Sequence, residues 1–169
     1  GIDGFAWDVE LLLAAKKTLE PELLHKTGDI AFQAGRHDTA VWCYEKLAEI
    51  QPHNLPVRGN LAHIYTFILR DLEKAAVQFR ALHKLEPGNT AHTFNLAICL
   101  AQLFHPAESL ELYDELCRQE VPIIQVVLGR AQLHHSLGHP EEAMGSLNPF
   151  RDRFWDDPAF LMAYMSTAY

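Results

Sequence analysis

A short pattern returns along this chain at a nearly constant spacing, and it constrains the fold more than any other feature. In each occurrence a small residue is followed four positions later by an aromatic residue or a leucine, as in the AVWCY of residues 40–44. The small residues lie 35, 34 and 34 positions apart, and the pairs are Ala40 and Tyr44, Ala75 and Phe79, Ser109 and Tyr113, and Ala143 and Leu147. A fixed period of this length indicates an array in which each unit is stable only when it is stacked on its neighbours.

Small residues, glycine and proline mark the parts of each unit. Antiparallel helices need small residues where their backbones approach most closely, and a second set of small residues precedes the first by about a dozen positions: Gly28, Ala62, Ala97 and Ala131. Gly35 and Gly138 follow a first helix, where a positive φ is convenient. Prolines at steps of 35 would stop the second helix, and they are Pro52, Pro87 and Pro122. Each unit is therefore predicted to be a helix pair.

The register predicts the position of each helix. First helices are expected near 21–35, 55–69, 90–104 and 123–137, and second helices near 38–51, 72–86, 106–119 and 140–153. The second unit carries one extra residue, which we place near 69–71. The fourth lacks a proline at the corresponding place, so its second helix should run longer or end irregularly. Ahead of the units, WDVELLLAAKKTLE predicts a further helix with Asp8 as its N-cap.

These landmarks resemble those of the tetratricopeptide repeat, which has a period of 34 residues and one antiparallel helix pair per unit. The first unit matches at Leu24, Gly28, Ala40, Tyr44 and Pro52, and departs at Ala31, where the family has a tyrosine. The resemblance covers roughly residues 21–155. It implies an all-α, right-handed superhelical solenoid with an N-terminal capping helix at 1–20. The four repeats are expected at 21–54, 55–89, 90–123 and 124–157. The helix at 158–169 either caps the array or is the truncated first helix of a further unit.

Charge and cysteine content exclude several classes of function. The net charge of −8 makes nucleic acid and anionic lipid poor partners. No apolar run of about 18 residues is present, so no membrane insertion is expected. The three cysteines, Cys43, Cys99 and Cys117, form no CxxC pair and are odd in number, which favours free packing thiols over disulfides or a zinc site. We expect a cytoplasmic protein, although bacterial envelope proteins use the same repeats.

Catalytic signatures are missing from the sequence. There is no GxSxG, P-loop, GxGxxG or HExxH, and the ten histidines are spread over different elements. His134 falls where the repeat has a packed tyrosine, so a packing role is favoured. We therefore expect no enzyme activity, no cofactor and no metal site.

The resemblance instead implies a concave groove, lined by the first helices, that binds a protein or peptide. The family's groove positions, transferred by register, predict these contact residues: Phe32, Asn60, His63, Phe67, Phe94, Asn95, Ile98, Leu128 and Gln132. The apolar members would form a stripe, and the two asparagines could pair with a ligand backbone. His25 and Asp29 replace the lysine and asparagine with which some members clamp a carboxylate, so that mode is rejected. The alternative is that these side chains pack between units or are covered by the chain's own PAFLMAYMSTAY segment.

Three functions fit these expectations. The first is an adaptor or scaffold that binds a largely apolar peptide segment in the groove. The second is a chaperone for type III secretion translocators, which the chain resembles in its length, acidity and N-terminal helix. The third is a structural repeat segment that mediates self-assembly as a homo-oligomer or within a larger protein.

Overall fold

The computed structural model describes residues 2–119 and 124–168, and the side chains from Val9 onward. Throughout these residues the regular structure is helical, and no strand is formed within them. The predicted all-α fold built from antiparallel helix pairs is thereby confirmed for the described residues. The chain divides into two compact units, Gly1–Glu86 and Pro87–Tyr169, which are treated separately below.

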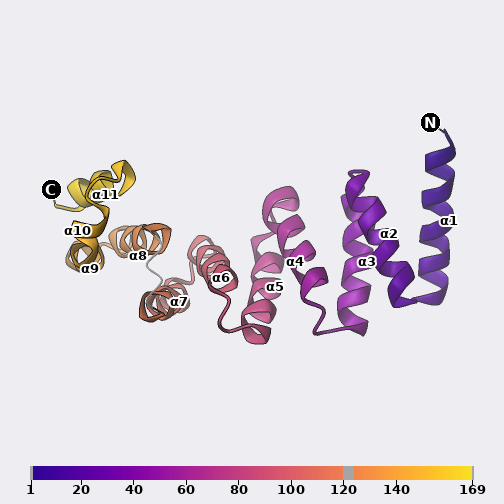
Figure 1. Ribbon diagram of the computed structural model, residues 1–169, viewed down its shortest axis with the longest axis horizontal. Helices are drawn as coiled ribbons and strands as arrows, with labels where there is room; N and C mark the ends of the chain where they lie inside the picture. Colours follow the sequence, from indigo (N-terminus) through magenta and orange to yellow (C-terminus); the bar gives the residue numbers. More distant parts are fainter. Residues whose placement is uncertain (1, 120–123, 169) are drawn as a thin grey trace. The chain divides into compact units, whose positions relative to one another are not determined.

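The first unit contains α1 and two helix pairs (Figure 1). Its elements are α1 (Ile2–Thr18), α2 (Pro21–Gln33), α3 (His37–Ile50), α4 (Leu55–His63), the π-helical turn η1 (Ile64–Leu69) and α5 (Leu72–Leu85). Helices α2 and α3 pack most closely at Gly28, where an added Cβ would lie 2.7 Å from Cε1 of Tyr44. The small residue at this position is therefore required for the packing of the pair.

Helix α1 begins before the residue that the sequence indicated. It runs from Ile2, so Asp8 lies inside the helix and not at its N-terminus. The prediction that Asp8 is the N-cap is therefore wrong, because the backbone N–H groups that follow Asp8 already have helical partners. Further along this helix, Ala15 is fully buried against the rest of the unit.

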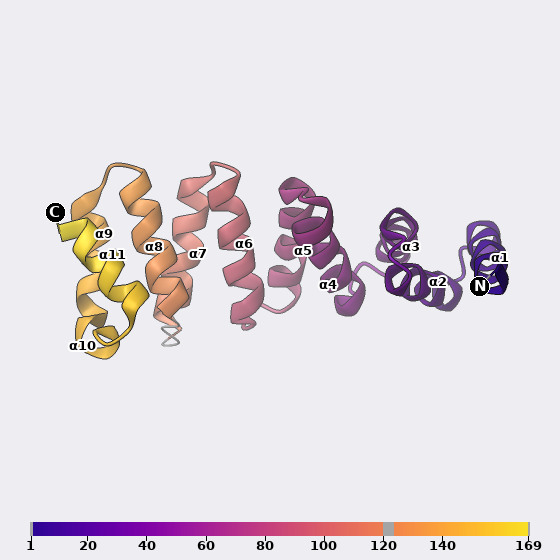
Figure 2. The ribbon, with the colours of Figure 1, turned by 90° about the horizontal axis from the view of Figure 1, so that it is seen from above.

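The second unit contains two further pairs and a terminal helix (Figure 2). Its elements are α6 (Thr90–Gln102), α7 (Pro106–Arg118), α8 (Ile124–Ser136), α9 (Pro140–Leu147), the 3₁₀ turn η2 (Asn148–Phe150), α10 (Arg151–Phe154) and α11 (Pro158–Ala168). Phe160 of α11 is fully buried with Val127, Ala131 and Leu147 of the α8–α9 pair. The terminal helix is therefore part of this unit's core.

The second helix of the fourth repeat ends irregularly, as expected. The repeat pattern did not indicate the cause. The helix stops at Leu147 and continues as η2 and α10. Pro149 lies inside η2 and has no N–H with which to continue the helical ladder. The range expected near 140–153 is therefore divided among α9, η2 and α10.

Every turn between the two helices of a pair contains one residue with left-handed backbone. These residues are Gly35, Arg70, Phe104 and Gly138, with φ values of 72°, 57°, 60° and 76°. In three of the turns the next residue donates its N–H to a carbonyl five positions earlier, as His105 does to Leu100 at 2.9 Å. This is the bond that closes a helix C-terminus around a left-handed residue.

The turn at Arg70 differs by one residue and locates the insertion in the second repeat. Here the N–H of Asp71 reaches back six positions to the carbonyl of Tyr65, at 2.9 Å. The additional residue is taken up by the wider π-helical turn η1, which precedes the turn itself. The insertion is therefore accommodated by η1 (64–69) and the turn that follows it, which overlap the expected position near 69–71, and the next pair stays in register.

Candidate functional site

The predicted groove residues are distributed over both units. The first unit holds Phe32, Asn60, His63 and Phe67, and the second holds Phe94, Asn95, Ile98, Leu128 and Gln132. Their surroundings differ between the two units, so each group is described in its own unit.

In the first unit, three of the predicted residues form an exposed aromatic ridge. The ring centroid of His63 lies 6.1 Å from that of Phe32 and 5.1 Å from that of Phe67. Phe67 projects from η1 and is 60% exposed, whereas Phe32 is half-buried and also contacts His37. The ridge offers ring faces and edges to a partner.

The fourth predicted residue of this unit, Asn60, is exposed but also bonds to the protein. The Asn60 amide donates a hydrogen bond to the hydroxyl of Tyr44, which itself donates to Oδ1 of Asp29 at 2.7 Å. Burial, followed by the hydrogen bond and charge of Asp29, raises the pKa of Tyr44 above its ordinary value. The three side chains form a polar network at the surface, in which the Asn60 amide has a partner within the protein.

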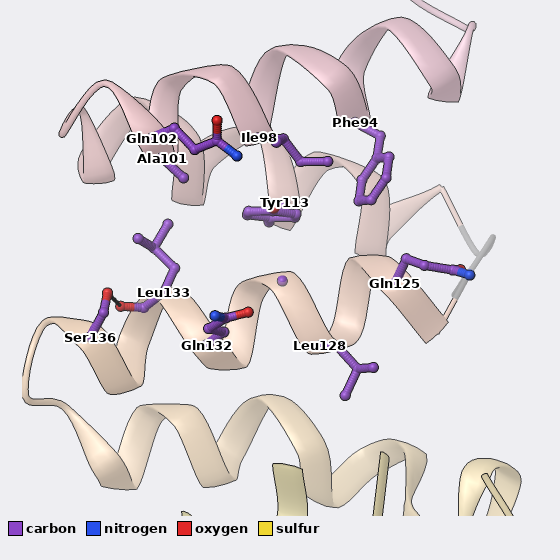
Figure 3. Close-up of a pocket in the computed structure, with 11 residues that line it drawn as sticks. Phe94, Ile98, Ala101, Gln102, Tyr113, Gln125, Leu128, Gln132, Leu133 and Ser136 are labelled. Atoms are coloured by element: carbon purple, nitrogen blue, oxygen red, sulfur yellow. Dashed lines mark hydrogen bonds between the residues drawn. The ribbon is translucent and has the colours of Figure 1, made fainter. Parts of the chain in front are cut away.

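In the second unit a pocket of about 430 Å³ lies between α6 and α8 (Figure 3). Four of the predicted residues line it, namely Phe94, Ile98, Leu128 and Gln132, whereas Asn95 is not among its lining residues. The structure brings these four together because they project from two consecutive first helices toward the same space. The volume suits one or two side chains of a ligand.

The wall of this pocket carries no charged side chain. Its polar lining consists of three glutamines, Ser136 and Tyr113, and the rest is apolar or glycine. Ser136 already donates to the carbonyl of Leu133 at 2.8 Å. A neutral wall within a chain of net charge −8 favours an uncharged ligand, because a charge would lose its hydration there without gaining a partner.

Tyr113 is one of the residues of this pocket that the sequence reasoning missed. It projects from α7, a second helix, and packs edge-on against Phe94 with ring centroids 6.4 Å apart. Its side chain reaches Gly129, where an added Cβ would lie 2.6 Å from the tyrosine oxygen. Burial raises the pKa of Tyr113 to about 12, so the hydroxyl keeps its proton at neutral pH. Its place after Ser109 in the repeat indicated a gap-filling ring but not a groove residue.

The terminal helix does not fill this pocket. None of the residues that line the pocket belongs to α11, which lies on the other side of α8 and forms a second hollow of about 570 Å³ with it. Leu128 and Gln132 line both hollows. Leu128 also packs against the cluster that contains Phe160 of α11, so PAFLMAYMSTAY approaches one predicted residue although it does not line the pocket between α6 and α8.

The cysteines and His134 have the packing surroundings that were expected. Cys43 and Cys99 are buried, Cys117 is half-buried, and all three are free thiols. Burial raises the pKa of Cys43 to about 11 and also raises those of Cys99 and Cys117. Burial, and then the charge of Arg130, lowers the pKa of His134. These groups are therefore neutral near pH 7 and act in packing.

Searches of the described residues for two further kinds of site were negative. Within 2–119 and 124–168, no group of three or more His, Cys, Asp or Glu side chains is arranged to hold a metal ion. In the same residues, no helix combines the length and the apolar character that crossing a membrane requires.

Comparison with known proteins identifies the fold. The sequence profile of the tetratricopeptide repeat matches residues 21–54. No curated protein sequence matches the chain closely enough to count as a relative. Among solved structures, the MamA protein superposes with a TM-score of 0.74 at 12% identity, over 87% of this chain and 80% of MamA.

Two other solved structures share the same architecture. A tetratricopeptide repeat protein from Parabacteroides merdae superposes with a TM-score of 0.69 at 20% identity, over 98% of this chain and 66% of its own. YrrB, described as a tetratricopeptide repeat protein with an unusual peptide-binding site, has a TM-score of 0.68 at 11% identity, over 93% and 81% of the two chains. The chain therefore matches the tetratricopeptide repeat at residues 21–54 and shares the helix-pair fold of solved tetratricopeptide repeat proteins.

Proposed function

We propose that the chain is a protein-interaction module and that the pocket between α6 and α8 binds an uncharged, largely apolar segment of a partner protein. The observation that carries this proposal is the neutral lining of the pocket, in which Phe94, Ile98 and Leu128 supply apolar surface. The glutamines at its rim can both donate to and accept from a peptide backbone. A peptide-binding site in YrrB, which has the same fold, is consistent with this use of the family's scaffold.

The exposed ridge of the first unit belongs to the same proposal. Phe32, His63 and Phe67 would contact further parts of the bound segment through their rings. We retain Asn60 and Asn95 as groove positions and keep the repeat boundaries 21–54, 55–89, 90–123 and 124–157. We also retain the absence of catalysis and the cytoplasmic location as parts of the proposal.

Self-assembly is a second candidate, and one observation on α11 favours it. Counted by the repeat, Leu161 and Met165 correspond to Val127 and Ala131 of α8, which are 1% and 3% exposed in the core shared with Leu147 of α9. In α11 the corresponding side chains are 37% and 46% exposed. This face therefore lacks the covering helix that the preceding pair has.

A matched pair of variants tests the pocket. Gln132 is exposed at its rim, so Gln132→Trp adds bulk to the opening without altering the core. Gln33→Trp adds the same bulk to an exposed position of α2, outside the pocket. Binding of capped, fluorescein-labelled peptides is measured by anisotropy, with neutral leucine-rich sequences compared against versions in which a leucine is replaced by glutamate or lysine.

We expect the neutral peptides to bind most tightly, and Gln132→Trp to abolish that binding while Gln33→Trp retains it. Charged versions that bind as tightly as the neutral ones would contradict the proposal, as would a Gln132→Trp variant that binds normally. Sedimentation of the same preparations addresses the second candidate, because a dimer that Met165→Glu converts to a monomer would support self-assembly through α11.

A further inference from the structure

The repeat places a tyrosine at the same position in both units, but the two hydroxyls have different partners. The Tyr44 hydroxyl donates to Asp29 and accepts from Asn60. The Tyr113 hydroxyl makes no hydrogen bond to any part of the chain that the structure describes, although the residue is only 3% exposed. The hydroxyl is not sealed inside the protein but lines the pocket, so a ligand atom can supply the partner that the described chain does not.

A comparison of equivalent repeat positions explains why Tyr113 lacks the hydrogen-bond partners that Tyr44 has. Asp29 is the ninth residue of α2, and the ninth residue of α6 is Ile98, which cannot accept a hydrogen bond. Asn60 is the sixth residue of α4, and the sixth residue of α8 is Gly129, which has no side chain. Both replacements remove polar atoms, and Gly129 also frees space where the pocket lies, and all three of Tyr113, Ile98 and Gly129 line it.

We propose that the Tyr113 hydroxyl is the hydrogen-bond donor that positions the ligand in this pocket, and that its acceptor is a main-chain carbonyl of an uncharged peptide segment. This inference rests on the proposed function and names the chemistry that the site recognises. An apolar side chain of the peptide occupies the space beside Ile98 and Gly129, and the adjacent carbonyl accepts from Tyr113. Bound ligand thus supplies the partner that Asp29 supplies to Tyr44 in the first unit.

The lining of the pocket selects a carbonyl over an anion. No Lys, Arg or His side chain lines it, so a carboxylate or a phosphate would be desolvated there without a counter-charge. A peptide carbonyl is neutral, and the neighbouring peptide groups can pair with the amides of Gln125 and Gln132. The site is therefore expected to reject free carboxyl termini and phosphorylated segments.

The test uses the full chain and a defined probe, the peptide Gly-Ser-Leu-Leu-Leu-Ser-Gly with fluorescein at its N-terminus and an amide at its C-terminus. Tyr113→Phe removes only the hydroxyl, and we expect it to weaken binding about 3- to 10-fold. Tyr44→Phe is the matched control in the first unit, which should lower the urea midpoint because it breaks the bond to Asp29 but leave the affinity unchanged. Tyr113→Phe should leave the urea midpoint unchanged or raise it, because it removes an unpartnered group.

A second perturbation examines the acceptor. The leucine amides of the probe are replaced by esters one at a time. An ester carbonyl is a weaker hydrogen-bond acceptor than an amide carbonyl. At one position the ester should reduce affinity for the wild-type chain but not for Tyr113→Phe, because the two changes remove the same interaction.

The outcomes separate this inference from the proposed function. A wild-type chain that binds none of the neutral peptides overturns both. A wild-type chain that binds the probe, together with Tyr113→Phe that binds equally well or an ester effect that is the same in both proteins, overturns the inference alone and leaves the apolar pocket as the binding site.

Discussion

Phe104 allows a direct test of what stabilises the turns between paired helices. Its backbone is left-handed, with φ of 60°, and the residue is 91% exposed, so its ring buries little surface. The equivalent turn of the next pair has Gly138 at φ of 76°, where an added Cβ would meet no atom within 4 Å. Phe104→Gly and Gly138→Ala are therefore opposite changes at equivalent positions of the same unit.

The expected change in the free energy of unfolding follows from the conformational preferences of the backbone alone. A left-handed conformation costs an L-residue roughly 1–2 kcal/mol, because its Cβ crowds the following carbonyl oxygen. Glycine avoids that cost but loses about 0.5–1 kcal/mol more conformational free energy on folding. The difference predicts that Phe104→Gly raises the free energy of unfolding by about 0.5–1 kcal/mol and that Gly138→Ala lowers it by about as much.

Urea unfolding followed by far-UV circular dichroism measures both changes. Phe104→Ala is the control, because it removes the ring but keeps a Cβ at the left-handed position, and it should leave stability unchanged within about 0.5 kcal/mol. A destabilising Phe104→Gly would refute the reasoning, since it would show that the exposed ring contributes more than the strained backbone costs. A neutral Gly138→Ala would refute it independently.

Two further predictions concern a buried thiol and the glycine beneath the pocket. Burial raises the pKa of Cys43 from its ordinary 9.0 to about 11, so the unfolded chain releases this proton first and the free energy of unfolding should fall as the pH rises from about 9 toward 11. Between pH 8 and pH 10 the urea midpoint should fall less for Cys43→Ala than for the wild-type chain. An equal fall in the two proteins would assign the effect to other groups. Gly129→Ala places a methyl 2.6 Å from the Tyr113 oxygen and should cost about 1–3 kcal/mol and weaken peptide binding, whereas Gly145→Ala, with no atom within 4 Å of the new methyl, should not.

The helix pairs were predictable because their determinants are local and repeated. Small residues at positions such as Gly28 and Ala97 indicated where two helices pack, and the period set the length of each unit. Departures from the period were harder to place. The extra residue of the second repeat lies in η1, because a helix can absorb an insertion by widening one turn and keep the following turn intact.

The candidate site was predictable only in part. Register identified Phe94, Ile98, Leu128 and Gln132, because residues at equivalent positions of consecutive first helices face the same side. It overlooked Tyr113, which reaches the pocket from a second helix only because Gly129 leaves room for its ring. Counting positions on one helix cannot reveal a contact that depends on the size of a residue on another.

The amino-acid sequence was sufficient to specify an all-α repeat protein, because a 34-residue period, small residues at helix contacts and prolines between units each act over a few turns of chain. It could not distinguish two equivalent tyrosines, one whose hydroxyl donates to Asp29 and one whose hydroxyl lines a pocket. That distinction depends on residues 15 or 16 positions away in sequence, such as Asp29 for Tyr44 and Gly129 for Tyr113. Packing brings these pairs into contact, and the contact determines whether a hydroxyl is satisfied by the protein or is free to bind a ligand.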